Sequence, residues 1–284
     1  MRSIMLDELF KQFIREQQYL KGVAPATVEH YQNAWIAFRK AFKDDEVTAT
    51  LPVDFIAFWK DSGTKHVSIN TYARPINTFL NWLHAQGKCA KTRIPKLKEE
   101  NPSYKPFDEK TLRKILLFKP KATWEKRLHV ILCLIMDTGL RIDEALRLER
   151  TDIDFDNLLI SVLGKGQKHR VVPYSHELRK LLFKHTITHK HKLVFCTRHG
   201  SKIIYSNVRR DWVNLSKRLG VEITSFHALR HNYALNHIRQ GGDIFSLQRL
   251  LGHSDLETTK IYVHLTTEDL SIVHKKTSIL SRLR

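Results

Sequence analysis

Apolar side chains recur every three or four positions along the first ninety residues, which is the period of an amphipathic α-helix. Four such stripes are present, and together they predict a compact helical domain over residues 1–90. Pro75 is expected to kink the fourth helix near its middle, and Gly87 is expected to end it. The stripes consist of Leu6, Leu9, Phe10 and Phe13; of Val28, Tyr31, Trp35, Phe38 and Phe42; of residues 53–59; and of Ile69, Tyr72, Ile76, Phe79, Leu80 and Leu83.

The rest of the chain, residues 104–284, predicts a mainly α-helical domain that contains a small antiparallel β-sheet. A buried stripe between Trp124 and Ile135 is followed by Gly139, a residue that commonly ends helices. The period then changes to two, which predicts a pair of strands around a tight turn. The strands are expected over residues 158–163 and 170–174 with the turn at 164–167, and later helices over 175–184, 205–219, 226–240 and 243–251.

Composition adds a strong imbalance of charge. The 284 residues carry 48 Lys and Arg against 29 Asp and Glu, a formal net charge of +19. Residues 1–100 hold only 15 basic and 11 acidic side chains, so most of the excess lies in residues 101–284. Such an excess favours a polyanionic partner, with nucleic acid first and an anionic membrane surface second. A basic surface that merely keeps the protein soluble is the alternative interpretation.

Several classes of protein are disfavoured. The longest apolar stretch, residues 130–136, is too short to span a bilayer, and Asp7 and Glu8 interrupt the start of the chain, which argues against a secretory signal. The three cysteines are scattered and form no CxxC pair, a pattern that favours a reducing compartment. We expect a cytoplasmic, nucleoid-associated protein without a membrane partner.

The helical period is lost between the two predicted domains. Residues 88–106 contain three prolines and many lysines, a composition typical of a linker. We predict a basic linker over residues 91–103 that can lie along DNA. The polar face of the preceding helix carries short side chains that can approach a phosphate backbone. The candidate DNA-binding residues are Asn70, Arg74, Asn77, Lys91, Arg93 and Lys96.

Four short patterns in the second domain carry groups suited to phosphate chemistry. Each one alone has an ordinary structural explanation, such as a salt bridge at a helix end, a hairpin turn or an aromatic residue in the core. The patterns are Thr138-Gly-Leu-Arg-Ile-Asp-Glu144, Gly164-Lys165-Gly166, His227-Ala-Leu-Arg230, and Leu251-Gly-His-Ser254 followed by Tyr262.

Two of these residues, Arg141 and Arg230, have guanidinium groups that can bind the oxygens of a phosphodiester in a bidentate manner. His227 precedes Arg230 by three residues, so both lie on one helical face. A tyrosine hydroxyl, with an ordinary pKa near 10, needs a base or a strongly positive field before it can attack phosphorus. Glu144 lies one turn after Arg141, and we expect it to orient that arginine or to cap its helix.

Together the patterns resemble the tyrosine recombinase family, of the phage integrase and Xer type, in residue identity and order. The intervals of 24 residues from Arg141 to Lys165 and of nine from His253 to Tyr262 also resemble the Xer arrangement. The resemblance is strong over residues 103–265. It is weaker over residues 1–95, where it rests on a helical, SAM-like core-binding domain. It implies a catalytic set of Arg141, Lys165, His227, Arg230, His253 and Tyr262.

The resemblance also implies the chemistry of each member of this set. Tyr262 would be the nucleophile and form a 3′-phosphotyrosyl bond with DNA, while Lys165 would protonate the departing 5′-hydroxyl. His227 would assist proton transfer, and His253 would hydrogen-bond the phosphate. The covalent bond preserves the phosphodiester energy, so no cofactor, neither metal nor ATP, is expected.

The sequence offers three weaker signs of a cofactor, and we interpret each as structural. The Gly164 turn lacks the spacing and the Ser or Thr of a GxxxxGK[ST] phosphate loop. The alternating aspartates 152, 154 and 156 lack the glycine and glutamate of a calcium loop. The histidines 185, 189 and 191, with a single cysteine nearby, are expected on the exposed surface, and no metal site is predicted.

The predicted protein is a site-specific tyrosine recombinase that serves integration, excision or cointegrate resolution of a mobile element, which we favour, or Xer-type dimer resolution. Because the first helix begins near residue 5, no separate arm-binding domain is expected before it. The resemblance implies double-stranded DNA with inverted-repeat core sites, a homotetramer on two sites with a dimer on each, and accessory DNA-bending proteins. Apolar residues after Tyr262 predict a C-terminal tail that docks into a neighbouring protomer. The alternatives are a type IB topoisomerase-like nicking-closing enzyme and a non-catalytic DNA-binding protein.

Overall fold

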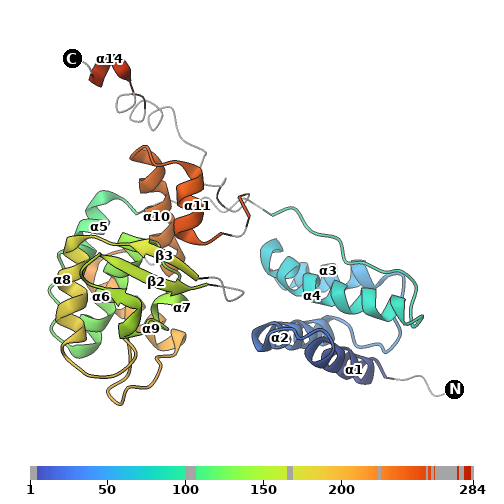
Figure 1. Ribbon diagram of the computed structural model, residues 1–284. Helices are drawn as coiled ribbons and strands as arrows, with labels where there is room; N and C mark the ends of the chain where they lie inside the picture. Colours follow the sequence, from blue (N-terminus) through green and yellow to red (C-terminus); the bar gives the residue numbers. More distant parts are fainter. Residues whose placement is uncertain are drawn as a thin grey trace. The chain divides into compact units, whose positions relative to one another are not determined.

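The computed structural model describes residues 5–99, 107–164, 169–222, 225–253, 255–256, 259, 274 and 278–282. The chain forms two compact units, Met1–Ser103 and Tyr104–Arg284, each built around its own hydrophobic core (Figure 1). The functional division into residues 1–90, 91–103 and 104–284 stays a prediction.

The described part of the first unit contains four helices, as the four apolar stripes predict. They are α1 (Leu6–Tyr19), α2 (Pro25–Ala41), α3 (Leu51–Asp61) and α4 (His66–Ala85). The core is rich in aromatic rings: Phe10 stacks on Trp35 with centroids 4.3 Å apart and meets Phe79 edge-on at 5.3 Å. Large aromatic side chains bury much apolar area for each residue, so this small unit holds a dense core. Helix α4 continues through the buried Pro75 and packs against the other three helices.

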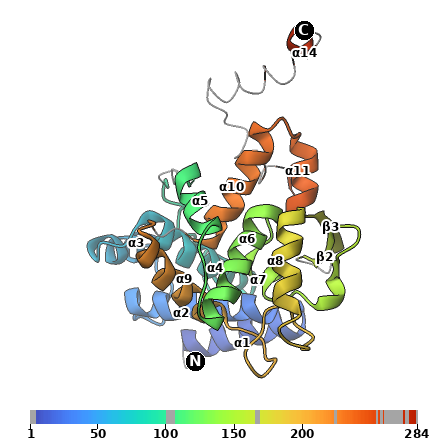
Figure 2. The same cartoon turned by 90° about the vertical axis from the view of Figure 1, so that its left-hand side faces the viewer.

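The second unit is organised around one apolar helix, α6 (Thr123–Thr138), which is buried along most of its length. Helices α5 (Glu109–Leu116), α8 (His176–Thr186), α9 (Tyr205–Leu219) and α10 (Phe226–Arg239) pack against it (Figure 2). A short turn of helix, α7 (Ile142–Ala145), follows α6, and α14 (Ile279–Arg282) lies near the end of the chain.

A small antiparallel sheet lies beside these helices, with strand order β1-β2-β3. Its strands are β1 (Ile153–Asp154), β2 (Leu159–Leu163) and β3 (His169–Pro173), and Ile160 pairs with Val172 in the register of β2 and β3. Both of these side chains are fully buried. The predicted class, mainly α with a small antiparallel sheet, is therefore confirmed, although β1, α5 and α7 were not expected from the pattern.

Helix α11 (Ile244–Leu251) joins the second unit through a separate small cluster of apolar residues. Ala234 and Ile238 of α10 pack there against Leu247 and Leu251 of α11. This contact holds α11 against α10. The candidate site lies at the C-terminal end of α11. Among the described residues, no helix combines the length and the apolar character needed to cross a bilayer.

Candidate functional site

The site begins where α6 ends. Gly139 terminates α6 in the left-handed conformation, with φ of 66°, and a Cβ atom there would lie 2.5 Å from the ring of Tyr233. A glycine is therefore required by both the backbone and the space. The chain then enters α7 with Arg141 at its start, so the Thr-Gly-Leu-Arg pattern delivers a guanidinium directly to the end of a buried helix.

Glu144 holds this arginine from within the same turn. Its Oε2 accepts a hydrogen bond from the backbone N of Arg141 at 2.8 Å, and its Oε1 accepts one from the Arg141 guanidinium at 3.0 Å. The same carboxylate receives both terminal nitrogens of Arg170, on β3, at 2.9 and 2.8 Å. Glu144 thus both caps its helix and orients Arg141, as the sequence suggests, and it also pairs with an arginine that the sequence did not single out.

The carboxylate of Glu144 is ionised in spite of its burial. Burial alone would raise the pKa of Glu144, but the hydrogen bonds from Arg170 and from the Arg141 backbone, with the charges of both arginines, hold its pKa below the ordinary value. Such charge-assisted, bidentate hydrogen bonds are the strong kind in proteins. The group therefore supplies a fixed negative charge around which arginines are arranged.

Arg230 enters the site from α10 and is almost fully buried, with 1% of its surface exposed. It donates hydrogen bonds to the carbonyl oxygens of Gly139 at 2.7 Å and Leu251 at 2.8 Å. Its Nη1 lies 3.9 Å from Oε2 of Glu144. The guanidinium is thus held by the end of α6, the end of α11 and the carboxylate of α7.

The C-terminal end of α11 accepts hydrogen bonds from all three arginines. The Leu250 carbonyl receives Arg170 at 2.9 Å, and the Leu251 carbonyl receives Arg230 and, at 3.3 Å, Arg141. The last carbonyls of a helix lack partners within it and carry partial negative charge. Guanidinium groups are well suited to satisfy them.

His253 follows directly after α11. Its Nε2 faces Nη2 of Arg230 at 3.0 Å, and its Nδ1 faces the buried hydroxyl of Thr259 at 2.8 Å. Burial, and then the positive charges of Arg230 and Arg141, lower the pKa of His253 to about 4. The ring is therefore neutral at neutral pH, and it accepts from Arg230 at Nε2 and donates to Thr259 from Nδ1.

His227 lies in the first turn of α10, one turn before Arg230. Burial first, and then the charges of Arg230 and Arg141, lower the pKa of His227 below its ordinary value. Its imidazole is thus neutral at neutral pH and able to accept a proton. Because the charges of Arg230 and Arg141 both act on its pKa, His227 shares the positive electrostatic field of the site.

The structure therefore brings together four of the six predicted catalytic residues: Arg141, His227, Arg230 and His253. Lys165 and Tyr262 lie outside the described residues, and all six catalytic roles stay predictions. Arg170 was missed. The sequence could have indicated it, because Arg170 lies two positions before Val172 on β3 and therefore shares the inward face of that strand. An arginine at such a position needs a partner.

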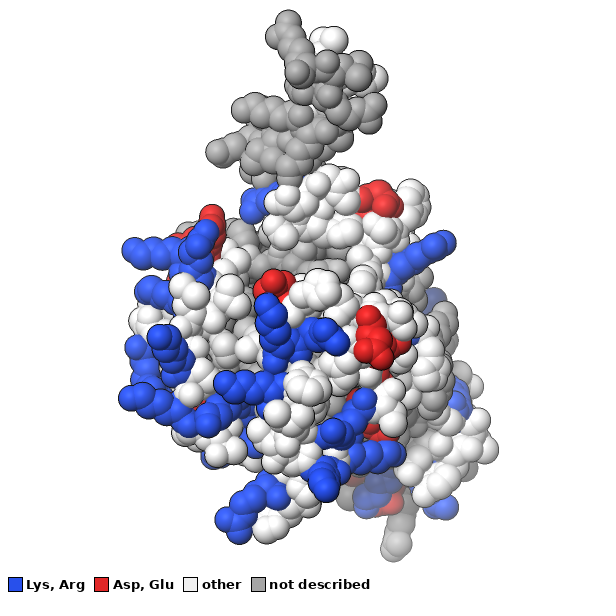
Figure 3. Space-filling model, turned by 60° about the vertical axis from the view of Figure 1, so that its left-hand side comes forward, with Lys and Arg blue, Asp and Glu red and all other residues white. Residues whose placement is uncertain are grey.

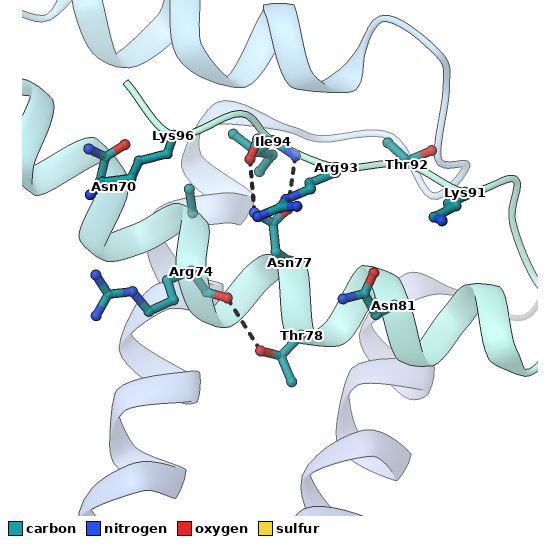
Figure 4. Close-up of a pocket in the computed structure, with 11 residues that line it drawn as sticks. Asn70, Arg74, Asn77, Thr78, Asn81, Lys91, Thr92, Arg93, Ile94 and Lys96 are labelled. Atoms are coloured by element: carbon teal, nitrogen blue, oxygen red, sulfur yellow. Dashed lines mark hydrogen bonds between the residues drawn. The ribbon is translucent and has the colours of Figure 1, made fainter. Parts of the chain in front are cut away.

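The candidate DNA-binding residues all line one groove of about 590 Å³ in the first unit. Figure 4 shows this groove between α4 and the chain that follows it. Arg74, Lys91, Arg93 and Lys96 supply its positive charge, while the amides of Asn70 and Asn77 bond the main chain at Leu97 and Ile94. Contact between these six residues and DNA stays a prediction, and the two asparagines already have partners within the protein.

The histidines of the predicted exposed surface are partly buried instead. His185 and His189 direct Nε2 toward the carbonyl oxygen of Val194, at 3.1 and 3.2 Å. Burial, with a smaller contribution from His189, lowers the pKa of His185 to about 4. Within the described part of the chain, no three His, Cys, Asp or Glu side chains are arranged to hold a metal ion.

A helical unit that gathers guanidiniums and neutral histidines at one point has the organisation of an enzyme acting on phosphodiesters. Basic side chains also outnumber acidic ones on the face shown in Figure 3. The chain belongs to the phage integrase family, the tyrosine recombinases, whose family model matches residues 105–269. The resemblance found in the sequence is thereby confirmed. Members of this family cleave and rejoin DNA through a tyrosine nucleophile, so the protein is an enzyme of site-specific recombination and DNA is its partner.

Relatives match along nearly the whole chain. The tyrosine recombinase XerA of Thermococcus onnurineus is 31% identical over 271 residues, which cover 93% of this chain and 93% of that protein. The tyrosine recombinase XerC of Corynebacterium glutamicum is 28% identical over 278 residues, covering 93% and 90%.

Solved structures share the fold. An integrase of the Tn1549 transposon, in complex with a circular-intermediate DNA, has a TM-score of 0.79 at 17% identity and covers 96% of this chain and 99% of that one. The XerH recombinase bound to a palindromic difH substrate has a TM-score of 0.73 at 20% identity and covers 95% and 84%.

Proposed function

We propose that Tyr262 is the nucleophile of this recombinase and that the arginine cluster at the end of α11 binds the scissile phosphate. The observation that carries the proposal is the convergence of Arg141 and Arg230 on the Leu251 carbonyl, with His253 facing Arg230. A phosphodiester transition state concentrates negative charge on its non-bridging oxygens, and preorganised guanidiniums stabilise that charge. Glu144 holds two of these groups in place before the substrate arrives.

The reaction proceeds by in-line displacement at phosphorus. The tyrosine oxygen of Tyr262 forms a bond to phosphorus while the bond to the 5′ oxygen breaks, leaving a 3′-phosphotyrosyl linkage and a free 5′-hydroxyl. His227, neutral at neutral pH, takes the tyrosine proton, and Lys165 gives a proton to the 5′ oxygen. Rejoining is the same displacement in reverse, by the 5′-hydroxyl of the partner strand.

For the biological role, we propose integration, excision or cointegrate resolution of a mobile element. The fold shared with the Tn1549 transposon integrase supports this role. The relatives named XerA and XerC support the second candidate, Xer-type dimer resolution. In either case the proposed assembly is a homotetramer on two inverted-repeat core sites, with the C-terminal tail docked into a neighbouring protomer and accessory proteins bending the DNA.

A suicide substrate tests the nucleophile. A nicked duplex carrying the recognition site should trap a covalent protein–DNA adduct with the wild-type chain. Tyr262→Phe should abolish the adduct, while Tyr205→Phe, a partly exposed tyrosine of the same unit, should keep it. An adduct that persists in Tyr262→Phe would refute the assignment.

A second assay separates recombination from nicking and closing. A plasmid with two directly repeated sites should yield two circles, and a supercoiled plasmid with one site should not be relaxed to completion. Efficient relaxation of the single-site plasmid, without recombinant product from paired sites, would favour the topoisomerase-like alternative.

A further inference from the structure

Four polar side chains along one face of α4 bond the main chain that follows this helix. Positions 66, 70, 77 and 84 fall within about 40° of one another at the 100° per residue of an α-helix. Their partners occur in the reverse order, so the segment runs back antiparallel to α4. The four pairs, which we call the α4 ladder, are His66–Lys98, Asn70–Leu97, Asn77–Ile94 and His84–Cys89.

The two asparagines of the α4 ladder make paired bonds of the kind that one strand makes with another. Asn77 donates to the Ile94 carbonyl at 2.9 Å and accepts from its N–H at 2.8 Å. Asn70 does the same at Leu97, with both distances 2.8 Å. Each amide therefore satisfies both backbone groups of one residue, which an extended segment lying on a helix could not otherwise satisfy internally.

These bonds fix the register of the segment. The Ile94 side chain is 1% exposed and belongs to the core of the first unit, and Leu97 packs against that core. A shift of one residue would break both amide pairs and take Ile94 out of its place in the core.

The fixed register places cations around a single groove. Lys91, Arg93 and Lys96 project from the segment, and Arg74 projects from α4 (Figure 4). The carboxylate of Glu99 accepts a bond from Asn70 at 2.7 Å and lies 3.9 Å from Lys96. The groove therefore has four cations with one carboxylate at its edge, a balance that suits a phosphate backbone.

We propose that Asn70 and Asn77 are positioning residues for DNA binding: they hold the segment so that its cations meet backbone phosphates in a fixed arrangement. This inference rests on the proposed function of the groove as a DNA contact. Its distinct content is that phosphate binding depends on two neutral amides as well as on the charges.

The test uses the full chain in four forms: wild type, Asn70→Leu/Asn77→Leu, the control Asn33→Leu, and Lys91→Gln/Arg93→Gln/Lys96→Gln. Asn33 is an exposed asparagine of α2 that belongs neither to the groove nor to the α4 ladder. Two quantities are measured: hydrogen exchange at the amides of Ile94 and Leu97, and the affinity for a short duplex of arbitrary sequence over a series of KCl concentrations. Each phosphate contact contributes about −0.9 to the slope of log affinity against log salt.

In the double-leucine variant, hydrogen exchange at the Ile94 and Leu97 amides should be at least about tenfold faster, because each amide loses the asparagine oxygen that accepts its hydrogen bond. Its salt slope should fall in magnitude by about two to three, nearly as much as in the charge variant. The charge variant should keep the slow exchange, and Asn33→Leu should keep both the slow exchange and a slope within about one contact of wild type.

The two proposals fail in different ways. If the charge variant binds with an unchanged slope, the groove is not a phosphate contact and the proposed function of the groove fails. If the charge variant loses contacts but the double-leucine variant keeps its slope, with either fast or slow exchange, the positioning role is refuted. Should the double variant not fold, the single variant Asn77→Leu provides the same test, with hydrogen exchange followed at the Ile94 amide and the salt slope of DNA affinity measured as before.

Discussion

The two units of this recombinase fix their functional groups in opposite ways. On α4, side-chain amides hold the main chain of the segment that follows. At the end of α11, main-chain carbonyls hold side-chain guanidiniums. The first arrangement is neutral and organises a surface, whereas the second is charged and depends on the buried carboxylate of Glu144. The difference predicts that the second unit is the more vulnerable to loss of one group and to acid.

The largest effect is expected from removing the charge at the centre of the arginine cluster. Glu144→Gln would leave Arg170 and Arg230, exposed by only 11% and 1%, without their common carboxylate. Breaking a buried pair in this way costs about 3–5 kcal/mol of stability. Urea unfolding measures this loss of stability. The control is Glu109→Gln, which breaks an exposed ion pair on α5 and should cost no more than about 0.5 kcal/mol. Equal losses in the two variants would contradict the central role of Glu144.

A slightly smaller effect is expected at the end of α6. Gly139→Ala would place a methyl group 2.5 Å from Tyr233 and 2.9 Å from Leu251, at a backbone conformation with positive φ. Overpacking and strain together should cost about 2–4 kcal/mol. Gly220→Ala is the matched control, since its φ is 59° and no atom lies within 4 Å, and it should cost only about 1 kcal/mol. Thermal or urea unfolding of both variants gives the comparison.

The acid response of the second unit gives the next prediction. His185, with a pKa of about 4 because of burial and the neighbouring His189, takes up its proton near pH 6.5 only when unfolded. Stability linked to this group is therefore complete above about pH 6.5 and is lost as the pH falls toward 4.

In His185→Gln, the difference in unfolding free energy between pH 7 and pH 5 should shrink by about 1–2 kcal/mol relative to wild type. Urea titrations at the two values measure it. His199→Gln, at an exposed position, should leave the difference intact. A wild-type pH dependence in His185→Gln would show that the ring is not buried as described.

The smallest effect is expected on the α4 ladder. Asn77→Ala removes two neutral hydrogen bonds to Ile94 and should cost about 1 kcal/mol. Since both groups are uncharged, the cost should be the same at pH 5 and pH 8. Asn33→Ala, at an exposed position on α2, serves as the control. A cost that changes strongly with pH would mean that charged groups, and not the amide, fix the segment.

The sequence predicts those parts of the molecule that depend on local periodicity. Long apolar stripes identify α1, α2, α4 and α6, and alternating residues identify β2 and β3, because burial of one face repeats with the geometry of each element. Strand β1 has two residues and α7 has four, which is too short for any period to be recognised.

Contacts between residues far apart in the sequence were not predicted, for a different reason. Arg170 meets Glu144 across 26 positions, and Asn77 meets Ile94 across 17. A polar residue on a helix has the same pattern whether it faces solvent, DNA or another part of the chain. The family motif located Arg141, Arg230 and the two histidines, since their order along the chain is characteristic even where their contacts are not.

The α4 ladder also limits how far the two units can separate. With the chain held to α4 as far as Lys98, the part between Glu99 and the start of α5 at Glu109 comprises residues 100–108. However it runs, such a stretch spans at most roughly 30–35 Å, about half the reach of a tether that began at residue 88.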